Sequence, residues 1–169
     1  GQDVRGMTQN ELRGRIAYIP QKAWLFSGTI ADNLRDGREG AREPEMFHAL
    51  KVAQAGFVEE LPEGLNAHVA QGGTKFSGGQ KQRLSIARAI AKDPKIYLFD
   101  DSFSALDFKT DVALRRALKA QTDNATVIIV AQRISTVLHA NQILVLDEGR
   151  LVGKGTHAQL MASCPEYQE

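Results

Sequence analysis

Two adjacent carboxylates, Asp100 and Asp101, follow the apolar run Ile96–Phe99 in the segment IYLFDDSFSALD. A carboxylate that directly follows a buried strand is well placed to hold Mg²⁺ beside phosphate groups, either directly or through water. We therefore predict that Asp100 is a metal-binding residue and that Asp101 lies where a general base or a water-orienting group belongs. Adjacent carboxylates repel each other, which also favours a bound cation at this position.

Polar side chains follow two other predicted strands. The run Ile16–Pro20 is followed by Gln21, and the run Val127–Ala131 is followed by Gln132. In open parallel α/β sheets, ligands bind at the carboxyl ends of the strands, so both glutamines are candidates for the same site as the carboxylates. Taken singly, each of these residues is explained more simply as the start of a loop.

A candidate anion site lies in the segment FSGGQKQRLSIARAIAK. Ser77 followed three residues later by Gln80 predicts a capping box at the start of an amphipathic helix. Gly78 and Gly79 then leave the helix N-terminus without side chains, where free N–H groups and the helix dipole attract an anion such as phosphate. The alternative is a flexible turn that simply precedes a helix.

Two familiar ligand-binding patterns are absent from the sequence. No segment matches the phosphate-binding loop G-x-x-x-x-G-K-[ST], and the nearest, which ends in Gly153–Thr156, has Glu148 where the first glycine belongs. The four histidines are scattered without the spacing of metal ligands. A complete nucleotide site therefore requires residues outside this sequence.

The composition restricts the class of protein. Lys and Arg (21) nearly balance Asp and Glu (20), and no long basic block is present, so a general nucleic-acid-binding surface is not indicated. The single cysteine, Cys164, cannot form an internal disulfide, which favours a reducing compartment. The apolar runs are far shorter than the roughly 18 residues of a membrane helix. The polar start without methionine indicates an excerpt of a longer protein.

Apolar runs alternate with helical periodicity along the chain, which predicts one α/β domain. No strand is expected between Asp36 and Thr74, where a helical and loop-rich insertion is predicted. We expect Lys81, Arg88 and Lys92 to form a solvated helix face. The predicted strands are Arg15–Ile19, Ile96–Phe99, Thr126–Val130 and a hairpin of Gln142–Leu146 with Arg150–Gly153 at a sheet edge. The predicted helices are Thr29–Leu34, Glu45–Ala55, Gly78–Ala91, Thr110–Lys119, Ile134–His139 and His157–Ala162.

Together, these segments resemble the nucleotide-binding domain of an ABC transporter of the exporter type. YIPQKAWLFSGTIADNL is similar to the Q-loop segment, FSGGQ to the LSGGQ signature, and VAQGGT to the exporter loop that contacts the transmembrane coupling helices. IYLFD resembles the Walker B strand, SALD the D-loop and IIVAQRIST the switch region. The resemblance implies a partial P-loop NTPase (RecA-like) layered α/β sheet with an inserted ABC-type helical subdomain. It divides the chain into 1–35 with the Q-loop, 36–92 with the signature, and 93–169 with the remaining motifs.

The resemblance also implies ligands, partners and a location. Gln21 and Asp100 would contact Mg²⁺, and Asp107 of the D-loop would lie near ATP. The signature residues would face ATP held by a second nucleotide-binding domain, so that two domains enclose two ATP molecules. These signature residues are Ser77, Gly78, Gly79 and Gln80. The domain would work with transmembrane domains, at the cytoplasmic face of the cell membrane, and without nucleic acid.

Two departures from the family pattern concern catalysis. The family has Glu and His where this chain has Asp101 and Gln132. A carboxylate withdrawn by one methylene is misplaced, and a misplacement of about 1 Å can lower a rate on the order of 100-fold. Gln132 can still donate a hydrogen bond to a phosphate, but it lacks the imidazole that can carry charge or a proton. The pair resembles the degenerate half of a heterodimeric exporter, whose partner is non-identical.

Other functions stay open at this point. One is a homodimeric exporter ATPase in which Asp101 is a slow base, and another is a soluble ABC ATPase that acts on DNA or ribosomes. The exporter-like segment LFSGTIADNL and the lack of a basic bias argue against the soluble class. A nonfunctional gene remnant is a further alternative. Because the phosphate-binding loop is absent, we expect the 169-residue chain alone neither to bind ATP tightly nor to hydrolyse it.

Overall fold

The structure is a computed structural model that describes residues 1–168. The chain divides into two compact units, Gly1–Val130 and a second unit that begins at Ala131. Each unit has a hydrophobic core of its own. No helix among the described residues is long and apolar enough to cross a lipid bilayer.

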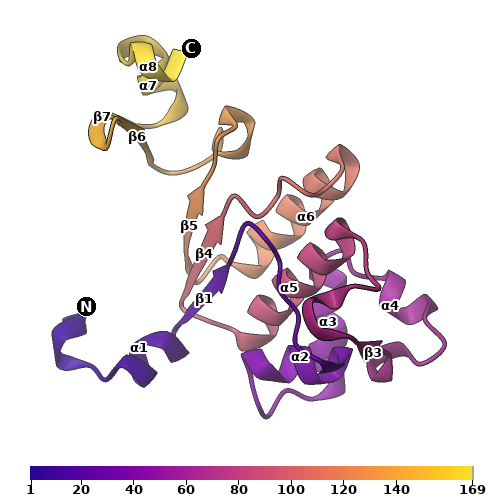
Figure 1. The fold of residues 1–169 in the computed structure, drawn as a ribbon. Helices are drawn as coiled ribbons and strands as arrows, with labels where there is room; N and C mark the ends of the chain where they lie inside the picture. The colour runs from indigo at the N-terminus through magenta and orange to yellow at the C-terminus, as the bar shows by residue number, and fades with distance from the viewer. Residues whose placement is uncertain (169) are drawn as a thin grey trace. The chain divides into compact units, whose positions relative to one another are not determined.

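A three-stranded parallel sheet lies at the centre of the first unit (Figure 1). Its order is β1 (Ile16–Ile19), β4 (Ile96–Asp100) and β5 (Thr126–Val130). The strands pair from their first residues onward, so their carboxyl ends lie at one edge of the sheet. The three strands predicted nearest the candidate site are therefore confirmed, as is the α/β class.

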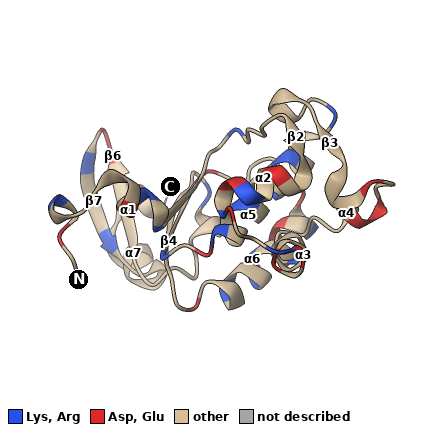
Figure 2. Cartoon of the chain, turned by 90° about the horizontal axis from the view of Figure 1, so that it is seen from below, with Lys and Arg blue, Asp and Glu red and all other residues tan. Residues whose placement is uncertain are grey.

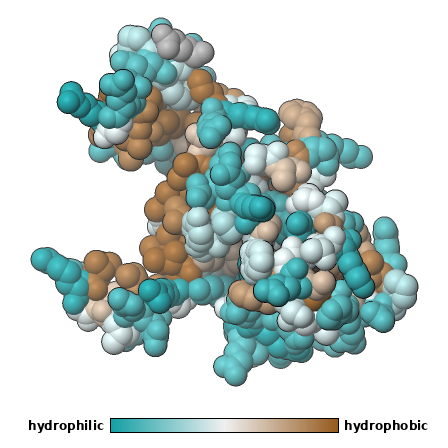
Figure 3. Space-filling model, in the orientation of Figure 1, coloured by the Kyte–Doolittle hydropathy of each residue, from teal (hydrophilic) through white to brown (hydrophobic). Residues whose placement is uncertain are grey.

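The sheet has one covered face and one open face. Helices α5 (Gly78–Lys92) and α6 (Phe108–Gln121) lie on the covered side (Figure 1). The open face carries Tyr18, Ile128 and Val130, which are 55%, 48% and 53% exposed, and Figure 3 shows apolar surface over these strands. The residues of β1 and β4 that point into the core are Ala17, Ile19, Tyr97 and Phe99.

Helix α5 is the centre of the helical layer, against which α2 (Ile30–Gly37) and α3 (Glu43–Val52) pack. It is stopped at Asp93, which adopts a left-handed backbone conformation. Four predicted helices of this unit, those beginning at Thr29, Glu45, Gly78 and Thr110, are confirmed with shifted ends. The side chains of α5 that the core buries are Gln82, Leu84, Ser85, Ile86, Ala87, Ala89, Ile90 and Ala91.

Several short elements of the first unit differ from the prediction. The expectation of no strand between Asp36 and Thr74 is wrong, because β3 (His68–Val69) pairs antiparallel with β2 (Gly28–Thr29). A strand of two residues is too short to show the alternation that identifies a strand. The sequence also did not predict α1 (Gln9–Gly14), α4 (Phe57–Glu60) and the 3-10 turns η1 (Val4–Gly6), η2 (Gly64–Asn66) and η3 (Gln71–Gly73).

The second unit contains the predicted hairpin, but among the described residues it forms a separate two-stranded sheet and not the edge of a larger sheet. Strands β6 (Ile143–Asp147) and β7 (Arg150–Gly155) pair antiparallel as a two-stranded sheet, and both turn residues between them have positive φ angles. Such a turn matches the twist of a two-residue hairpin. Helices α7 (His157–Ser163) and α8 (Pro165–Gln168) follow, of which the first was predicted. The core of this unit consists of Ile143, Leu160, Cys164 and Tyr167.

The helix predicted over Ile134–His139 is not formed. Only a 3-10 turn, η4 (Ile134–Thr136), is present there. Three of the four residues from 134 to 137 are β-branched: Ile134, Thr136 and Val137. Their restricted χ1 angles lower helix propensity.

Candidate functional site

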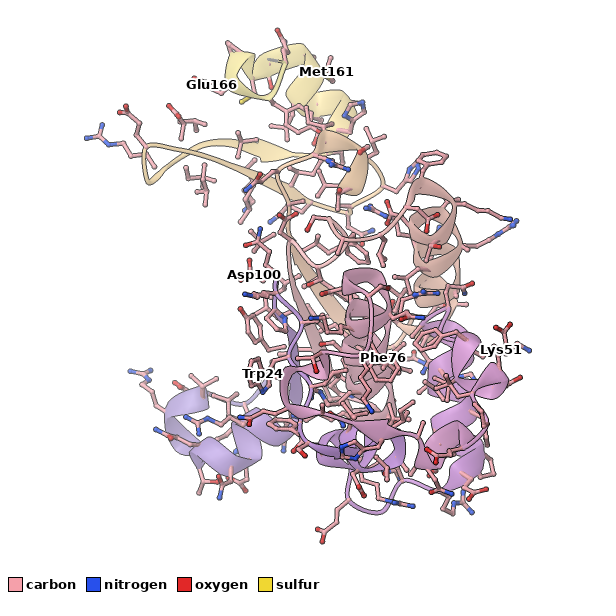
Figure 4. The ribbon with its side chains drawn as sticks, turned by 45° about the vertical axis from the view of Figure 1, so that its right-hand side comes forward. Trp24, Lys51, Phe76, Asp100, Met161 and Glu166 are labelled. Atoms are coloured by element: carbon pink, nitrogen blue, oxygen red, sulfur yellow. The ribbon has the colours of Figure 1, made fainter. Side chains whose placement is uncertain are left out.

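The two carboxylates and Gln21 meet at the carboxyl edge of the parallel sheet. Gln21 Nε2 donates a hydrogen bond of 3.1 Å to Oδ2 of Asp101. Tyr18, on the same strand that leads to Gln21, donates its hydroxyl to Oδ2 of Asp100 over 2.9 Å. Figure 4 shows Asp100 at the end of its strand, directed away from the helical layer. The structure therefore brings three of the predicted site residues together and adds Tyr18.

The backbone turns sharply between the two carboxylates. Asp101 has a φ angle of 46°, in the left-handed region that aspartate and asparagine tolerate better than most residues. Its N–H donates to the carbonyl of Val130 at 2.9 Å, and its carbonyl accepts from Ser104 Oγ at 3.1 Å. The buried Ser102 hydroxyl donates to the Ile19 carbonyl at 2.6 Å, which ties this turn to the end of β1. These bonds hold the backbone of Asp101 in its turn conformation.

Gln132 lies in the second unit, where it is exposed, in the segment between β5 and η4. The carboxylates lie in the first unit. That Gln132 belongs to the same site as these carboxylates stays a prediction.

The start of α5 has the predicted capping box. Ser77 Oγ accepts from the N–H of Gln80 at 3.2 Å, and Gln80 Oε1 accepts from the N–H of Ser77 at 3.0 Å. The N–H groups of Gly78 and Gly79 remain in the first turn, where a helix offers no acceptor. Gly78 is exposed, and a Cβ atom added there would meet nothing within 4 Å. An anion can therefore approach this helix start closely.

Arg83 fixes this helix start against the preceding helices. Its Nε donates to the carbonyl of Gly79 at 3.2 Å, and its Nη1 donates to the carbonyl of Gln54 at 2.8 Å. The guanidinium carbon also lies 5.0 Å from the ring centroid of Phe57. Arg83 thus bonds a carbonyl of the signature segment, and this contact leaves the N–H groups at the helix start available to a ligand.

Asp107 is the N-cap of α6. Its Oδ1 accepts from the N–H of Thr110 at 3.0 Å and its Oδ2 from the Thr110 hydroxyl at 2.7 Å. These bonds hold the pKa of the Asp107 carboxyl below its ordinary value. The side chain therefore has a structural role here, and contact with a nucleotide stays a prediction.

The expectation of a solvated face on α5 is wrong for two of its basic residues. Arg88 Nη2 donates to the carbonyl of Trp24 at 2.9 Å, and Lys92 Nζ donates to the carbonyl of Ile16 at 2.7 Å. Burial lowers the pKa of both side chains. Long side chains reach main-chain carbonyls of a segment distant in the sequence, which helical periodicity alone does not reveal.

Gln82 links α5 to the segment that holds Gln21. Its side chain is only 1% exposed, and its Nε2 donates to the carbonyl of Pro20 at 3.3 Å. This hydrogen bond therefore connects α5, whose start is one candidate ligand site, to the residue that precedes Gln21, the other candidate. The helical pattern of the sequence does not distinguish this glutamine from its neighbours.

Replacing Gln82 by methionine, which has a similar volume, should lower the free energy of unfolding by about 1 to 2 kcal/mol, because the Pro20 carbonyl loses a buried donor. Thermal unfolding followed by circular dichroism checks this result. The exposed Gln9 of α1 provides the control, since Gln9→Met removes no buried hydrogen bond. An equal effect of both substitutions would contradict the role assigned to Gln82.

The donor set at the sheet edge suits Mg²⁺. Among residues 1–168 no group of three or more His, Cys, Asp or Glu side chains forms a metal cage. Mg²⁺ does not require one, because it is bound in proteins by one or two carboxylates together with phosphate oxygens and several waters. The carboxylate of Asp100 and the amide oxygen of Gln21 provide oxygen ligands of this kind.

Comparisons with known proteins agree with this geometry. The family model described as "ABC transporter" matches residues 1–104. The chain is 50% identical to an ABC transporter ATP-binding protein of Mycobacterium tuberculosis, with 100% of the chain and 29% of the relative covered. It is 40% identical to the ATP-dependent lipid A-core flippase of Desulfotalea psychrophila, with 99% of the chain and 30% of the relative covered.

A solved structure of a bacterial Atm1-family ABC exporter with ATP bound is also similar. It superposes with a TM-score of 0.93 at 40% identity, over 99% of this chain and 30% of that one. The chain thus spans about 30% of the length of the proteins that it matches. Its motifs, its fold and these similarities together place it in the ABC transporter family, as part of a nucleotide-binding domain of the exporter type.

Proposed function

We propose that the chain is part of an ATP-binding and hydrolysis module that couples ATP to the export of a substrate across a membrane. The observation that carries this proposal is the group of Asp100, Asp101 and Gln21 at one sheet edge, in the same unit as a glycine helix start that can receive phosphate. Relatives include a lipid A-core flippase and a heavy metal exporter, so the class of exported substrate differs within the family.

The residues have separate roles in this proposal. Asp100 and Gln21 would hold Mg²⁺ beside the phosphates of ATP, and the ion would supply positive charge to the phosphoryl group. Asp101 orients water or accepts its proton, and Gln132 donates to the terminal phosphate. The signature residues bind ATP held by a partner domain, and Asp107 lies beside them.

The site of this domain is the slower one of the pair. Asp101 is one methylene shorter than glutamate, and its Oδ2 already accepts from Gln21 at 3.1 Å. A shorter side chain places the carboxylate farther from the attacking water, and a misplacement of about 1 Å can lower a rate on the order of 100-fold. Gln132 is neutral and cannot gain or lose a proton near neutral pH as imidazole can. Both features favour a domain that binds ATP and hydrolyses it slowly.

The proposed partners follow from the same division of roles. The start of α5, with Ser77, Gly78, Gly79 and Gln80, would bind ATP held by a second, non-identical nucleotide-binding domain. Transmembrane domains would contact this domain at the cytoplasmic face of the membrane. Nucleic acid is not a proposed partner. Lys and Arg are interspersed with Asp and Glu over the elements in Figure 2, and the formal charge is +1.

The alternative is a homodimeric exporter in which Asp101 is the working base. The substitution Asp101→Ala in the full-length transporter, assembled with its partner, distinguishes the two. We expect the steady-state ATPase rate to change less than twofold, because turnover takes place at the other site. The measurement is phosphate release at saturating ATP and Mg²⁺.

A collapse of the rate toward background after Asp101→Ala would select the homodimeric alternative. Ser104→Ala is a matched control on the same turn, since it removes only the bond from Ser104 Oγ to the Asp101 carbonyl. Turnover of the full-length protein in the absence of any second chain would equally contradict the proposed heterodimer.

A further inference from the structure

Each of the two carboxylates accepts a hydrogen bond from β1 or from the segment that directly follows it. Gln21 donates to Oδ2 of Asp101, and Tyr18 donates to Oδ2 of Asp100. The register of the sheet explains the second contact. Tyr18 pairs with Leu98, so Asp100 lies two residues further along the neighbouring strand and on the same face. The length of two strand residues, about 6.6 Å, is within reach of a tyrosine side chain.

Tyr18 lies on the open face of the sheet. Tyr18 is 55% exposed, whereas its neighbours Ala17 and Ile19 are 4% and 0% exposed. The Tyr18 hydroxyl donates to Oδ2 of Asp100 over 2.9 Å. This hydrogen bond therefore links Tyr18 of β1 to the carboxylate that ends β4.

We propose that Tyr18 is a positioning residue that holds Oδ2 of Asp100, so that Oδ1 is presented to the metal ion. This inference rests on the proposed function, in which Asp100 binds Mg²⁺. In the part of the chain that the structure describes, no side chain donates to Oδ1. A carboxylate held through one oxygen cannot rotate freely, and partners that orient a metal ligand typically change metal affinity 10- to 100-fold when removed.

Tyr18 also separates the tasks of the two carboxylates. Asp100 receives a donor from a rigid strand residue, while Asp101 receives one from Gln21, which follows the strand and is exposed. The first carboxylate is thereby fixed for metal binding. The second is bonded to a residue that can exchange partners when a ligand arrives.

The test is metal binding to the full-length transporter with a non-hydrolysable ATP analogue. Mn²⁺ replaces Mg²⁺, and bound Mn²⁺ is measured by electron paramagnetic resonance in the parent and in Tyr18→Phe. We expect about tenfold weaker Mn²⁺ binding in Tyr18→Phe at unchanged affinity for the nucleotide analogue. Phenylalanine keeps the ring, so the fold is preserved. Tyr97→Phe is the matched control, because Tyr97 lies on the neighbouring strand but faces the core.

The assembled transporter is proposed to have two ATP sites, so bound Mn²⁺ is expected in two classes. The class that Asp100→Asn weakens is the one that belongs to this domain. If Asp100→Asn weakens that class while Tyr18→Phe stays within twofold of the parent, the role of Tyr18 is wrong and the proposed metal site stands. If Asp100→Asn leaves every class unchanged, the metal site itself is misassigned and the inference on Tyr18 fails with it. Equal weakening by Tyr18→Phe and Tyr97→Phe would show a general effect on the sheet and overturn the inference.

Discussion

A negative charge at the first residue of α5, introduced by Gly78→Asp, is expected to lower ATP turnover of the assembled transporter at least 100-fold. The N–H groups of this helix start are proposed to bind phosphate of the ATP held by the partner. A carboxylate at Gly78 occupies that position and repels the phosphate. Loss of a single preorganised donor to developing charge already lowers rates on the order of 100- to 1,000-fold.

The fold should tolerate this substitution. A Cβ atom at Gly78 meets nothing within 4 Å, and an acidic residue in the first turn of a helix stabilises it by about 0.3 to 1 kcal/mol. The melting temperature of Gly78→Asp is therefore expected to stay equal or to rise while turnover falls. A structural defect would lower both, so the two measurements together separate a binding role from a folding role.

Two controls refine the result. Gly78→Ala adds a methyl group without charge and is expected to lower turnover much less than Gly78→Asp. Gly56→Asp places the same charge at the N-cap of α4, which is also exposed and open, and should leave turnover unchanged. Turnover of Gly78→Asp within threefold of the parent would mean that this helix start does not contact phosphate.

The local features of this chain were predictable from its sequence. The capping box of Ser77 and Gln80 and the strand that ends at Asp100 each depend on residues within a few positions of one another. The α/β alternation indicated a parallel sheet but not the order of its strands. The short pair of β2 and β3 lacked a sequence pattern, and the β-branched segment after Arg133 did not sustain the helix that its apolar spacing indicated.

The contacts that hold the candidate site depend on distant residues. Tyr18 and Asp100 are 82 positions apart, and Gln82 and Pro20 are 62 positions apart. No periodicity relates such pairs, because the sheet register and the docking of α5 decide which side chains meet. The sequence therefore indicated the candidate site residues, but not their contacts with Tyr18 and Gln82.

Lengthening the second carboxylate by Asp101→Glu is expected to raise ATP turnover at the site of this domain about 100-fold. The added methylene moves the carboxylate toward the position that the family pattern assigns to the general base, and a shift of about 1 Å is worth that factor. Glutamate tolerates the φ angle of 46° less well than aspartate, so a modest loss of stability should accompany the gain. Adding Gln132→His should raise turnover further, since imidazole can carry charge.

The measurement requires that turnover at the other site be silenced, so the catalytic glutamate of the partner domain is replaced by glutamine in every sample. Phosphate release then reports only the site of this domain. Asp100→Glu is the matched control, because it makes the same chemical change one residue earlier, where we expect it to displace the metal carboxylate and to lower turnover. If Asp101→Glu and its combination with Gln132→His both stay within twofold of the parent, these two residues do not limit hydrolysis, and the slow-site proposal is wrong.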